Sequence, residues 1–354
     1  MNDVRHDPLI TTLQTLADLT GVSGDETKVR RAIKPLVENH VDTLRVDALG
    51  NLITYKRGTA ENPLRVLVTA HMDEVGFMVT GHTGEGGLRV AAVGSIPERL
   101  LPGTHVWVGQ EPLAGVIGLQ AIHRLHGESF PQAAPIEDLV VDIGAKNKEE
   151  AQEAAPLGTV ITFATRCREM GAVLTGKAFD DRAGCAILVA LLQGERLPCD
   201  LYGVFTVQEE VGLRGARVAA YAVEPDVGFV LEGTLVDDLP KHEKDVSPTT
   251  ELGKGPAITV MDRSYITPPR LLSHVLKTAA VESIPCQLKQ PGISGTEAGG
   301  IHPARGGVPA ITIAVPCRYI HSPRAVLHPN DLANTLRLVR ASIARLTPET
   351  LAFT

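Results

Sequence analysis

Hydrophobic positions near both ends of the chain recur at the spacing of helices and buried strands. Close to the N-terminus, leucines three or four residues apart predict an amphipathic helix: Leu9, Leu13, Leu16 and Leu19. Ser23 and Glu26 fit a capping box that would start a second helix. Continuous apolar runs predict buried strands over residues 65–70, 201–207, 227–231 and 308–315, and longer periodic patterns predict helices over 183–192, 268–281 and 329–346. This alternation is typical of an α/β fold.

The pattern changes between residues 75 and 165. Glycine becomes frequent, and short alternating runs predict small antiparallel strands at 88–93, 105–108, 116–119 and 158–163. The first helical pattern of this region is at 149–155. We therefore expect an α/β catalytic domain with a mixed sheet and helices on both faces, made of residues 1–74 and 166–354, and a small β-barrel-like domain inserted at 75–165.

The composition narrows the function classes. With 354 residues, 44% hydrophobic positions and 21% charged ones, the chain is an ordinary globular protein. A net charge of −7 and a single Trp argue against a nucleic-acid binder. Five cysteines without a CxxC pair indicate reduced thiols, and no apolar run predicts a leader or a membrane span. We expect a cytoplasmic protein that binds neither nucleic acid nor membrane.

Metal-type side chains follow the predicted buried strands. These residues are His71, Glu209 with Glu210, Glu232 and His321, and the adjacent pair of Asp180 and Asp181 opens a helix. Residues that follow different strands can converge at one edge of an α/β sheet. Histidines with several carboxylates suit a pair of divalent ions about 3.5–4 Å apart, with one carboxylate bridging. Nitrogen and oxygen ligands favour Zn²⁺, Co²⁺ or Mn²⁺ over Ca²⁺ or Mg²⁺.

The spacing within these motifs suggests two further roles. Asp73 is two residues after His71, so in a strand both side chains would point the same way and Asp73 could orient the imidazole. Glu209 would then be free to act as the general base that deprotonates a metal-bridging water.

Each motif alone has an ordinary structural reading. Paired glutamates usually form a solvated loop, and Asp180 with Asp181 could cap a helix. Glu232 could lie in a turn, and His321 could be an exposed loop histidine. The joint pattern favours the metal site, because each residue follows or opens an apolar segment that otherwise needs no charge. The remaining histidines, including His123 and His126, we interpret as structural. The glycine-rich stretch 292–307 either shapes a substrate pocket or forms a surface loop.

Motifs in a fixed order resemble one known family. AHMDEVGF, KAFDDRAG, FTVQEEVGLRGA, VLEG, SGTEAGGI and RYIHS are similar to motifs of the glutamyl aminopeptidases and tetrahedral (TET) aminopeptidases, which have dinuclear metal sites. The resemblance covers nearly the whole chain. It implies a zinc-peptidase-like catalytic domain and release of N-terminal residues from short peptides. It also implies dimers formed through the β domain and a hollow dodecamer that admits only peptides.

The resemblance also implies roles for individual residues. His71 would bind one ion with Asp73 in support, and Asp180 would bridge both ions, followed by a cis peptide bond to Asp181. Glu209 would be the base. The remaining ligands to the two zinc or cobalt ions would be Glu210, Glu232 and His321.

Two positions depart from the family pattern, and two alternative functions stay open. Many members have Asp where this chain has Glu232 and Glu297, which leaves the metal preference and the preferred N-terminal residue open. Some relatives carry a cellulase label, so an endoglucanase-type glycoside hydrolase is one alternative. Such an enzyme needs two acids roughly 5–9.5 Å apart without an obligatory metal. The other alternative is a non-catalytic scaffold on the same fold.

Overall fold

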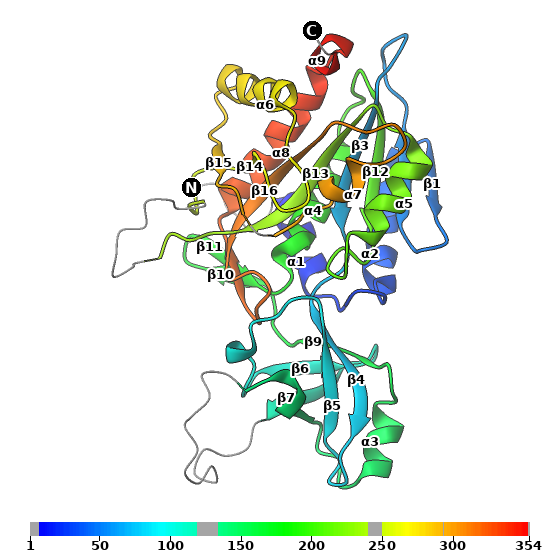
Figure 1. Ribbon diagram of the computed structural model, residues 1–354, viewed down its shortest axis with the longest axis vertical. Coiled ribbons are helices and arrows are strands. Elements are labelled where there is room, and N and C mark those ends of the chain that lie inside the picture. The colour runs from blue at the N-terminus through cyan, green and yellow to red at the C-terminus, as the bar shows by residue number, and fades with distance from the viewer. Residues whose placement is uncertain (1–6, 119–133, 240–249, 293, 353–354) are drawn as a thin grey trace.

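Two lobes, one above the other, make up the computed structural model, which describes residues 7–118, 134–239, 250–292 and 294–352 (Figure 1). The larger lobe contains an 11-stranded mixed sheet, and the smaller lobe is a closed barrel. Four histidines lie outside the described residues: His6, His123, His126 and His242.

The larger lobe is built from segments on both sides of the barrel in sequence. Its helices are α1 (Pro8–Ala17), α2 (Thr27–Val37), α4 (Phe179–Gln193), α5 (Arg214–Val223), α6 (Pro269–Val281), α7 (Ala298–Ile301), α8 (Pro329–Ala344) and α9 (Pro348–Leu351), with a 3₁₀ turn at Glu38–His40. Its strands are β1 (Thr43–Val46), β2 (Leu52–Lys56), β3 (Arg65–His71), β10 (Arg168–Met170), β11 (Val173–Gly176), β12 (Asp200–Thr206), β13 (Val227–Leu235), β14 (Ala257–Thr259), β15 (Gln287–Lys289), β16 (Ala310–Arg318) and β17 (Ala325–Leu327).

The centre of the sheet is parallel. The order is β1-β2-β12-β3-β13-β16-β17-β11-β10, and β12, β3, β13 and β16 all run in the same direction. β14 and β15 lie off this path, where β14 pairs with β16. Since parallel strands end at a common edge, the loops after the four central strands meet there.

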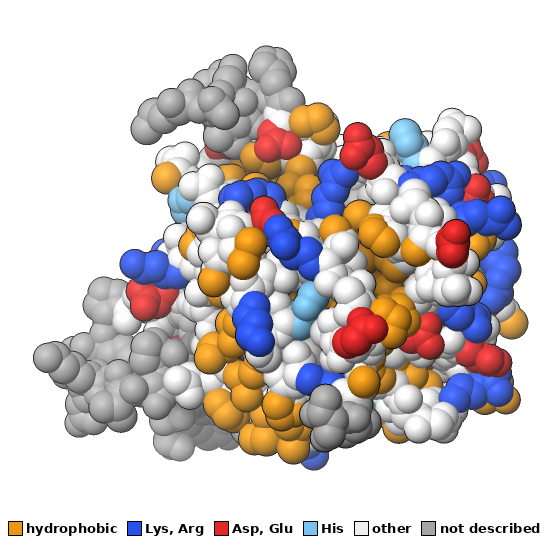
Figure 2. Space-filling model, turned by 90° about the horizontal axis from the view of Figure 1, so that it is seen from above, with side chains coloured by type: hydrophobic (Ala, Val, Ile, Leu, Met, Phe, Trp, Pro, Cys, Tyr) orange, Lys and Arg blue, Asp and Glu red, His pale blue; other side chains and the backbone are white. Residues whose placement is uncertain are grey.

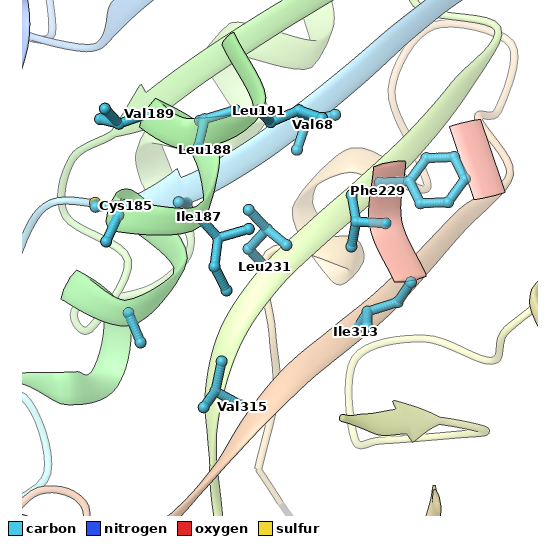
Figure 3. Close-up of a cluster of buried hydrophobic side chains, with 14 of the residues drawn as sticks. Val68, Cys185, Ile187, Leu188, Val189, Leu191, Phe229, Leu231, Ile313 and Val315 are labelled. Atoms are coloured by element: carbon cyan, nitrogen blue, oxygen red, sulfur yellow. The ribbon is translucent and has the colours of Figure 1, made fainter. Parts of the chain in front are cut away.

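Helices cover both faces of this sheet, because successive strand residues point to opposite sides. Val68, Phe229 and Leu231 pack with α1, α2, α4, α6 and α8 in one apolar cluster. Leu67 and Val230 pack with α5 and α7 in another. Figure 3 shows α4 lying against the first face, with its apolar side chains beside those of β3, β13 and β16. Each fully buried aliphatic side chain of this kind contributes about 1.5–3 kcal/mol.

The barrel occupies the insert. Its strands are β4 (Gly76–His82), β5 (Leu88–Val93), β6 (His105–Val108), β7 (Leu113–Gly118), β8 (Val140–Asp142) and β9 (Val160–Phe163), and β9 pairs with β4 to close it. It also contains α3 (Lys148–Ala154) and 3₁₀ turns at Glu98–Leu100 and Ile136–Asp138. Its apolar core is separate from that of the larger lobe and includes an edge-to-face pair of Phe77 and Phe163 with ring centroids 5.9 Å apart.

The structure confirms the predicted mixed sheet, the helices on both faces and the inserted barrel. The domain boundaries at 74/75 and 165/166 stay a prediction, although every barrel strand lies between them. The strand at 116–119 begins earlier, at Leu113, and its predicted last residue, Leu119, lies outside the described residues.

Two local predictions are wrong. Ser23 and Glu26 form no capping box, because α2 begins at Thr27 and no side chain caps it. The strand predicted to end at Leu231 continues to Leu235, so Glu232 lies inside β13. Helix α5 was not predicted, although its buried residues Ala216, Ala219, Ala220 and Val223 recur at helical spacing.

The surface seen from above the larger lobe mixes Lys and Arg side chains with Asp and Glu side chains (Figure 2). Exposed apolar side chains are scattered between them. In the part of the chain that the structure describes, none of the helices has the length and apolar character needed to cross a bilayer.

Candidate active site

The parallel edge of the sheet brings together the polar residues that follow the central strands. β3 ends at His71, which is in register with Thr206 at the end of β12, and the loop after Thr206 carries Glu209 and Glu210. Glu232 reaches the same place from within β13. His321 follows β16 and has a positive φ of 57°, which turns the chain back toward the sheet edge.

Asp180 is the central carboxylate of this cluster. It lies at the kinked start of α4, before a cis peptide bond to Asp181. Its Oδ1 lies 3.4 Å from His71 Nε2, and its Oδ2 lies 3.2 Å from His321 Nε2. The two oxygens of one carboxylate therefore face two different imidazoles.

Two glutamates extend the cluster on either side of Asp180. Glu232 Oε2 lies 3.4 Å from His71 Nε2, and Glu210 Oε1 lies 3.3 Å from His321 Nε2. Glu209 Oε2 is farther from His71 Nε2, at 4.0 Å. The structure thus brings His71, Asp180, Glu210, Glu232 and His321 into one neighbourhood, with Glu209 beside them.

Ligand atoms close enough to hold a cation occur in two groups among the described residues. His71, Asp180 and Glu210 form one group, and His71, Asp181 and Glu232 form the other, with the atoms of each within 4.8 Å of one another. Asp181 is a poor candidate ligand, because its oxygens already accept hydrogen bonds from the backbone N–H groups of His71 (3.2 Å) and Gly184 (2.9 Å).

The glutamates of the cluster are unfavourable as bare anions. Burial raises the pKa of Glu209 well above its usual range, and the charges of Glu232 and Glu210 add to this effect. Burial raises the pKa of Glu210 to about 8 and also raises the pKa of Glu232. Crowded carboxyls in a low-dielectric site keep protons unless other positive charge is supplied.

The imidazoles and Asp180, in contrast to the glutamates, are stabilised in their charged forms. Burial alone would lower the pKa of His71, but its contacts with Asp180, Asp73 and Glu232 outweigh burial and raise that pKa well above the usual value. The pKa of His321 is likewise raised, to about 9, despite burial. Burial would raise the pKa of Asp180, but the two imidazoles hold it below its usual range. The cluster therefore requires positive charge, and the protons on its two histidines supply part of it, with Lys289 interacting with Glu232 and Asp180 as well.

Asp73 is fully buried and holds the loop that carries the glutamate pair. Its Oδ1 accepts a hydrogen bond from the backbone N–H of Glu209 at 3.0 Å, and its Oδ2 accepts one from that of Glu210 at 3.1 Å. Ser23 Oγ donates to Oδ2 at 2.6 Å. His71 Nδ1 lies 3.1 Å from the backbone oxygen of Asp73 and 3.5 Å from Oδ1.

A second buried charge cluster lies behind the first, around Glu74. Lys177 Nζ lies 2.6 Å from Glu74 Oε1 and 2.7 Å from Oε2, and Arg182 Nη2 lies 3.5 Å from Oε1. Thr162, on barrel strand β9, donates its hydroxyl to Oε2 at 2.9 Å. Gly21 N–H donates to Oε1 at 3.1 Å. Glu74 therefore joins the start of the barrel to the segment that carries Asp180.

Two further features border the candidate site. A small cavity next to Asp180, Glu210 and His321 is also lined by Val75 and Phe163, so the barrel lobe forms part of its wall. The backbone N–H of Glu297 donates to Glu232 Oε1 at 3.1 Å. The glycine-rich stretch therefore touches the site rather than forming only a surface loop.

Sequence reasoning missed some residues of this region. Lys177, Glu74 and Arg182 stand inside the motifs KAFDDRAG and AHMDEVGF, where their position next to candidate ligands was the available signal. Ser23 and Glu26 were assigned to a helix cap, and nothing in the sequence linked them to Asp73, which follows β3, or to the loop after β12.

Comparisons with known proteins agree over nearly the whole chain. The model of the M42 glutamyl aminopeptidase family matches residues 50–338. A putative aminopeptidase of Acetivibrio thermocellus is 36% identical over 333 residues, covering 94% of this chain and 97% of that protein. The glutamyl aminopeptidase of Lactococcus lactis is 32% identical (96% and 97% covered), and the lysyl aminopeptidase of Pyrococcus furiosus is also 32% identical (95% and 97% covered).

Solved structures give the same result. The TET aminopeptidase of a marine-sediment Thaumarchaeota archaeon has a TM-score of 0.91 at 37% identity, with 98% of this chain and 99% of that chain covered. The TET1 peptidase of Pyrococcus horikoshii, which can assemble into a tetrahedron or a large octahedral shell, has a TM-score of 0.83 at 33% identity (96% and 100% covered). An endoglucanase of Thermotoga maritima has a TM-score of 0.77 at 38% identity (94% and 96% covered).

Proposed function

The chain belongs to the M42 glutamyl aminopeptidase family and is a peptidase, and from this premise we propose that it is a metal-dependent aminopeptidase that releases N-terminal residues from short peptides. The observation that carries the proposal is the position of Asp180 between two imidazoles, with Oδ1 3.4 Å from His71 Nε2 and Oδ2 3.2 Å from His321 Nε2. A carboxylate in this position suits a bridge between two cations.

The donor set fits two divalent ions per subunit. One ion would be held by His71, Asp180 and Glu232, and the other by Asp180, Glu210 and His321. The distances from each imidazole to its neighbouring carboxylates, 3.2–3.4 Å, support this division. It also leaves Asp181 to its two backbone hydrogen bonds. Nitrogen and oxygen ligands favour Zn²⁺ or Co²⁺, with Mn²⁺ as a third choice.

The electrostatics of the cluster support cation binding as well. Burial raises the pKa of Glu210 to about 8, so this carboxyl needs added positive charge to ionise fully at neutral pH. Burial also raises the pKa of Glu209 above its usual range, and added positive charge would favour its ionised form as well. Cations at this place would replace the protons on the acids and on the imidazoles, and binding would therefore release protons. We expect the ligands to act as a set, because removing one carboxylate would leave part of the positive charge of the ions without a compensating negative charge.

Glu209 is the proposed general base. It belongs to neither proposed ligand set. Its carboxylate nevertheless lies beside the cluster, with Oε2 4.0 Å from His71 Nε2. It would take a proton from the attacking water and pass it to the leaving amine. The bound ions would supply polarisation of the scissile carbonyl, a lowered pKa for water and an anchor for the free amino terminus.

Asp73 is the proposed positioning residue for both halves of this machinery. Its carboxylate holds the backbone of Glu209 and Glu210, and it lies 3.5 Å from the Nδ1 of His71. It would therefore fix the base and the first ligand relative to each other.

Self-association through the barrel is part of the proposal. Strand β7 exposes Leu113 and Val116, and the neighbouring turn exposes Leu100, with exposed fractions of 37–43%. Apolar side chains of this kind suit a dimer contact. A dimer along each edge of a tetrahedron gives a hollow dodecamer that admits only peptides, in line with the tetrahedral assembly of a relative. Light scattering of the wild type and of a Leu113→Glu variant would test both steps.

A cytoplasmic location stays part of the proposal. All five cysteines lie among the described residues and none forms a disulfide, as expected for a reducing compartment.

The deciding experiment assays the metal-reconstituted protein against a panel of aminoacyl-anilides, with and without chelator. We expect hydrolysis that chelation abolishes and added Zn²⁺ or Co²⁺ restores, and the panel identifies the preferred N-terminal residue. Hydrolysis of a β-glucan that survives exhaustive chelation would instead favour a glycoside hydrolase. A Glu209→Gln chain that replaces the wild type fully in cells would favour a scaffold.

A further inference from the structure

Two side chains in the turn before α2 contact residues of the candidate site and do not cap the helix. Ser23 and Glu26 stand at the spacing of a capping box, yet neither side chain caps α2. Ser23 Oγ donates to Asp73 instead, and Glu26 Oε1 accepts the backbone N–H of Gln208 at 3.1 Å and that of Gly24 at 2.7 Å. A local sequence rule that fails in this manner is expected at functional positions.

Side-chain oxygens from three remote segments hold four consecutive backbone N–H groups of the loop that carries the base. The pairs are Val207 with Asn51 Oδ1 (3.0 Å), Gln208 with Glu26 Oε1 (3.1 Å), Glu209 with Asp73 Oδ1 (3.0 Å) and Glu210 with Asp73 Oδ2 (3.1 Å). All four N–H groups are thus committed to the protein itself. Their role is to fix the loop rather than to bind substrate.

The loop needs this support because its backbone is strained. Gln208 has a φ of 55°, in the left-handed region that non-glycine residues rarely adopt. A residue in this conformation is destabilising by itself and persists only when its surroundings hold it in place. Glu26 is 4% exposed, and its Oε1 accepts a hydrogen bond from the backbone N–H of Gln208, one position before Glu209.

We propose that Glu26 is a positioning residue for Glu209: it holds the strained Gln208 backbone so that the Glu209 carboxylate reaches the attacking water. This inference rests on the proposed function of Glu209. Glu26 acts through hydrogen-bond geometry, and a single oxygen accepts both of its backbone N–H donors. An error of about 1 Å in the position of a catalytic group can cost about 10²-fold in rate.

Three variants test the inference in the metal-loaded full-length protein. Glu26→Ala should lower kcat by about 10²-fold, with KM and bound metal unchanged, because substrate and metal ligands stay in place. Glu26→Gln should recover most of kcat, since the amide oxygen can occupy the position of Oε1. Asp25→Ala is the matched control and should keep wild-type kcat, because the Asp25 carboxylate contacts Gln110 at 2.8 Å and not the base loop.

Several outcomes would overturn the inference. Wild-type kcat in Glu26→Ala would do so, as would a loss of kcat that only follows loss of metal, or a failure of Glu26→Gln to recover activity. If Glu26→Ala does not fold, Glu26→Asp replaces it: the shorter arm withdraws the acceptor, so kcat should fall, and wild-type kcat would contradict the proposal.

A parallel Glu209→Gln variant separates this inference from the proposed function. Full activity in Glu209→Gln would remove the base assignment and with it the role of Glu26. An inactive Glu209→Gln beside a fully active Glu26→Ala would remove only the role of Glu26.

Discussion

Two buried charge clusters lie back to back in the larger lobe, and their charge balance differs. Around Glu74, one carboxylate meets the protein's own cations, Lys177 and Arg182, at distances of 2.6, 2.7 and 3.5 Å. Around Asp180, the cationic partners within 4.0 Å of the carboxylates, among the residues that the structure describes, are two imidazoles. Residues of the two clusters are close neighbours in the sequence, since Asp73 directly precedes Glu74 and Lys177 is three residues before Asp180.

The difference separates a structural brace from a binding site. A buried acid that has its own protein cations needs nothing further and holds segments together. Buried acids in excess of protein cations are costly unless a cation arrives from outside. The first cluster should therefore control folding, and the second should control metal content and turnover.

The largest expected effect is on turnover. Glu209→Gln should lower kcat by about 10²–10⁴-fold, because a general base contributes about that factor. Metal content should match the wild type, measured by atomic emission after dialysis. Glu195→Gln is a suitable control, since that side chain is 94% exposed. Loss of metal in Glu209→Gln would move Glu209 into the ligand set.

The second effect is on folding. Glu74→Leu should lower the free energy of unfolding by about 3–5 kcal/mol, because it leaves Lys177 and Arg182 buried without their anion. Urea unfolding of metal-free protein would measure it. Asp42→Asn should change stability much less, because its partner Arg196 is partly exposed and water screens the pair. Equal losses in the two variants would contradict a bracing role for Glu74.

A third effect links metal to stability. An ion present at about 100 times its dissociation constant stabilises the folded state by about 2.7 kcal/mol. His321→Ala should bind less metal than the wild type and gain less thermal stability when Zn²⁺ or Co²⁺ is added. His105→Ala, on an exposed barrel position, should behave as the wild type. Retention of both ions by His321→Ala would remove His321 from the ligands.

The smallest effect is a pH dependence of the brace. Burial lowers the pKa of Lys177 to about 8, from a usual 10.5. Between these values the unfolded chain keeps a proton that the folded chain has lost, so this residue makes the free energy of unfolding rise with pH across that window and adds no slope below it. Urea unfolding of metal-free wild type and Lys177→Met should differ in this slope. Identical slopes would contradict the lowered pKa.

Much of the fold followed from local patterns. The apolar runs before His71 and Glu209 predicted β3 and β12, because a strand buried on both faces is apolar at successive positions. The leucines of α1 and the apolar residues of α4 predicted helices for a similar reason. Helix α5 was missed although Ala216, Ala219, Ala220 and Val223 recur at helical spacing. Its attachment to the sheet is tertiary: Asn51 Nδ2 donates to the backbone oxygen of Gly215, 164 residues away.

The sequence indicated which residues could gather at the candidate site, but not how their atoms are arranged there. Residues that follow parallel strands must meet at one edge, so His71, Glu210 and His321 could be grouped from the sequence. Glu232 also lies beside His71, although the reason given for grouping it was wrong, since β13 does not end there. The resemblance to a family supplied the central place of Asp180 and its cis peptide bond, and the structure has both features.

The sequence by itself determined which chemistry is present, because side-chain types and their order along apolar segments are fixed in the chain. Only the tertiary structure decided which oxygen faces which imidazole and which acid is neutralised by protein cations. It also decided that Glu26 holds the backbone of Gln208, a contact that spans 182 residues. Such contacts depend on how whole strands and helices pack, and no local pattern of residues encodes them.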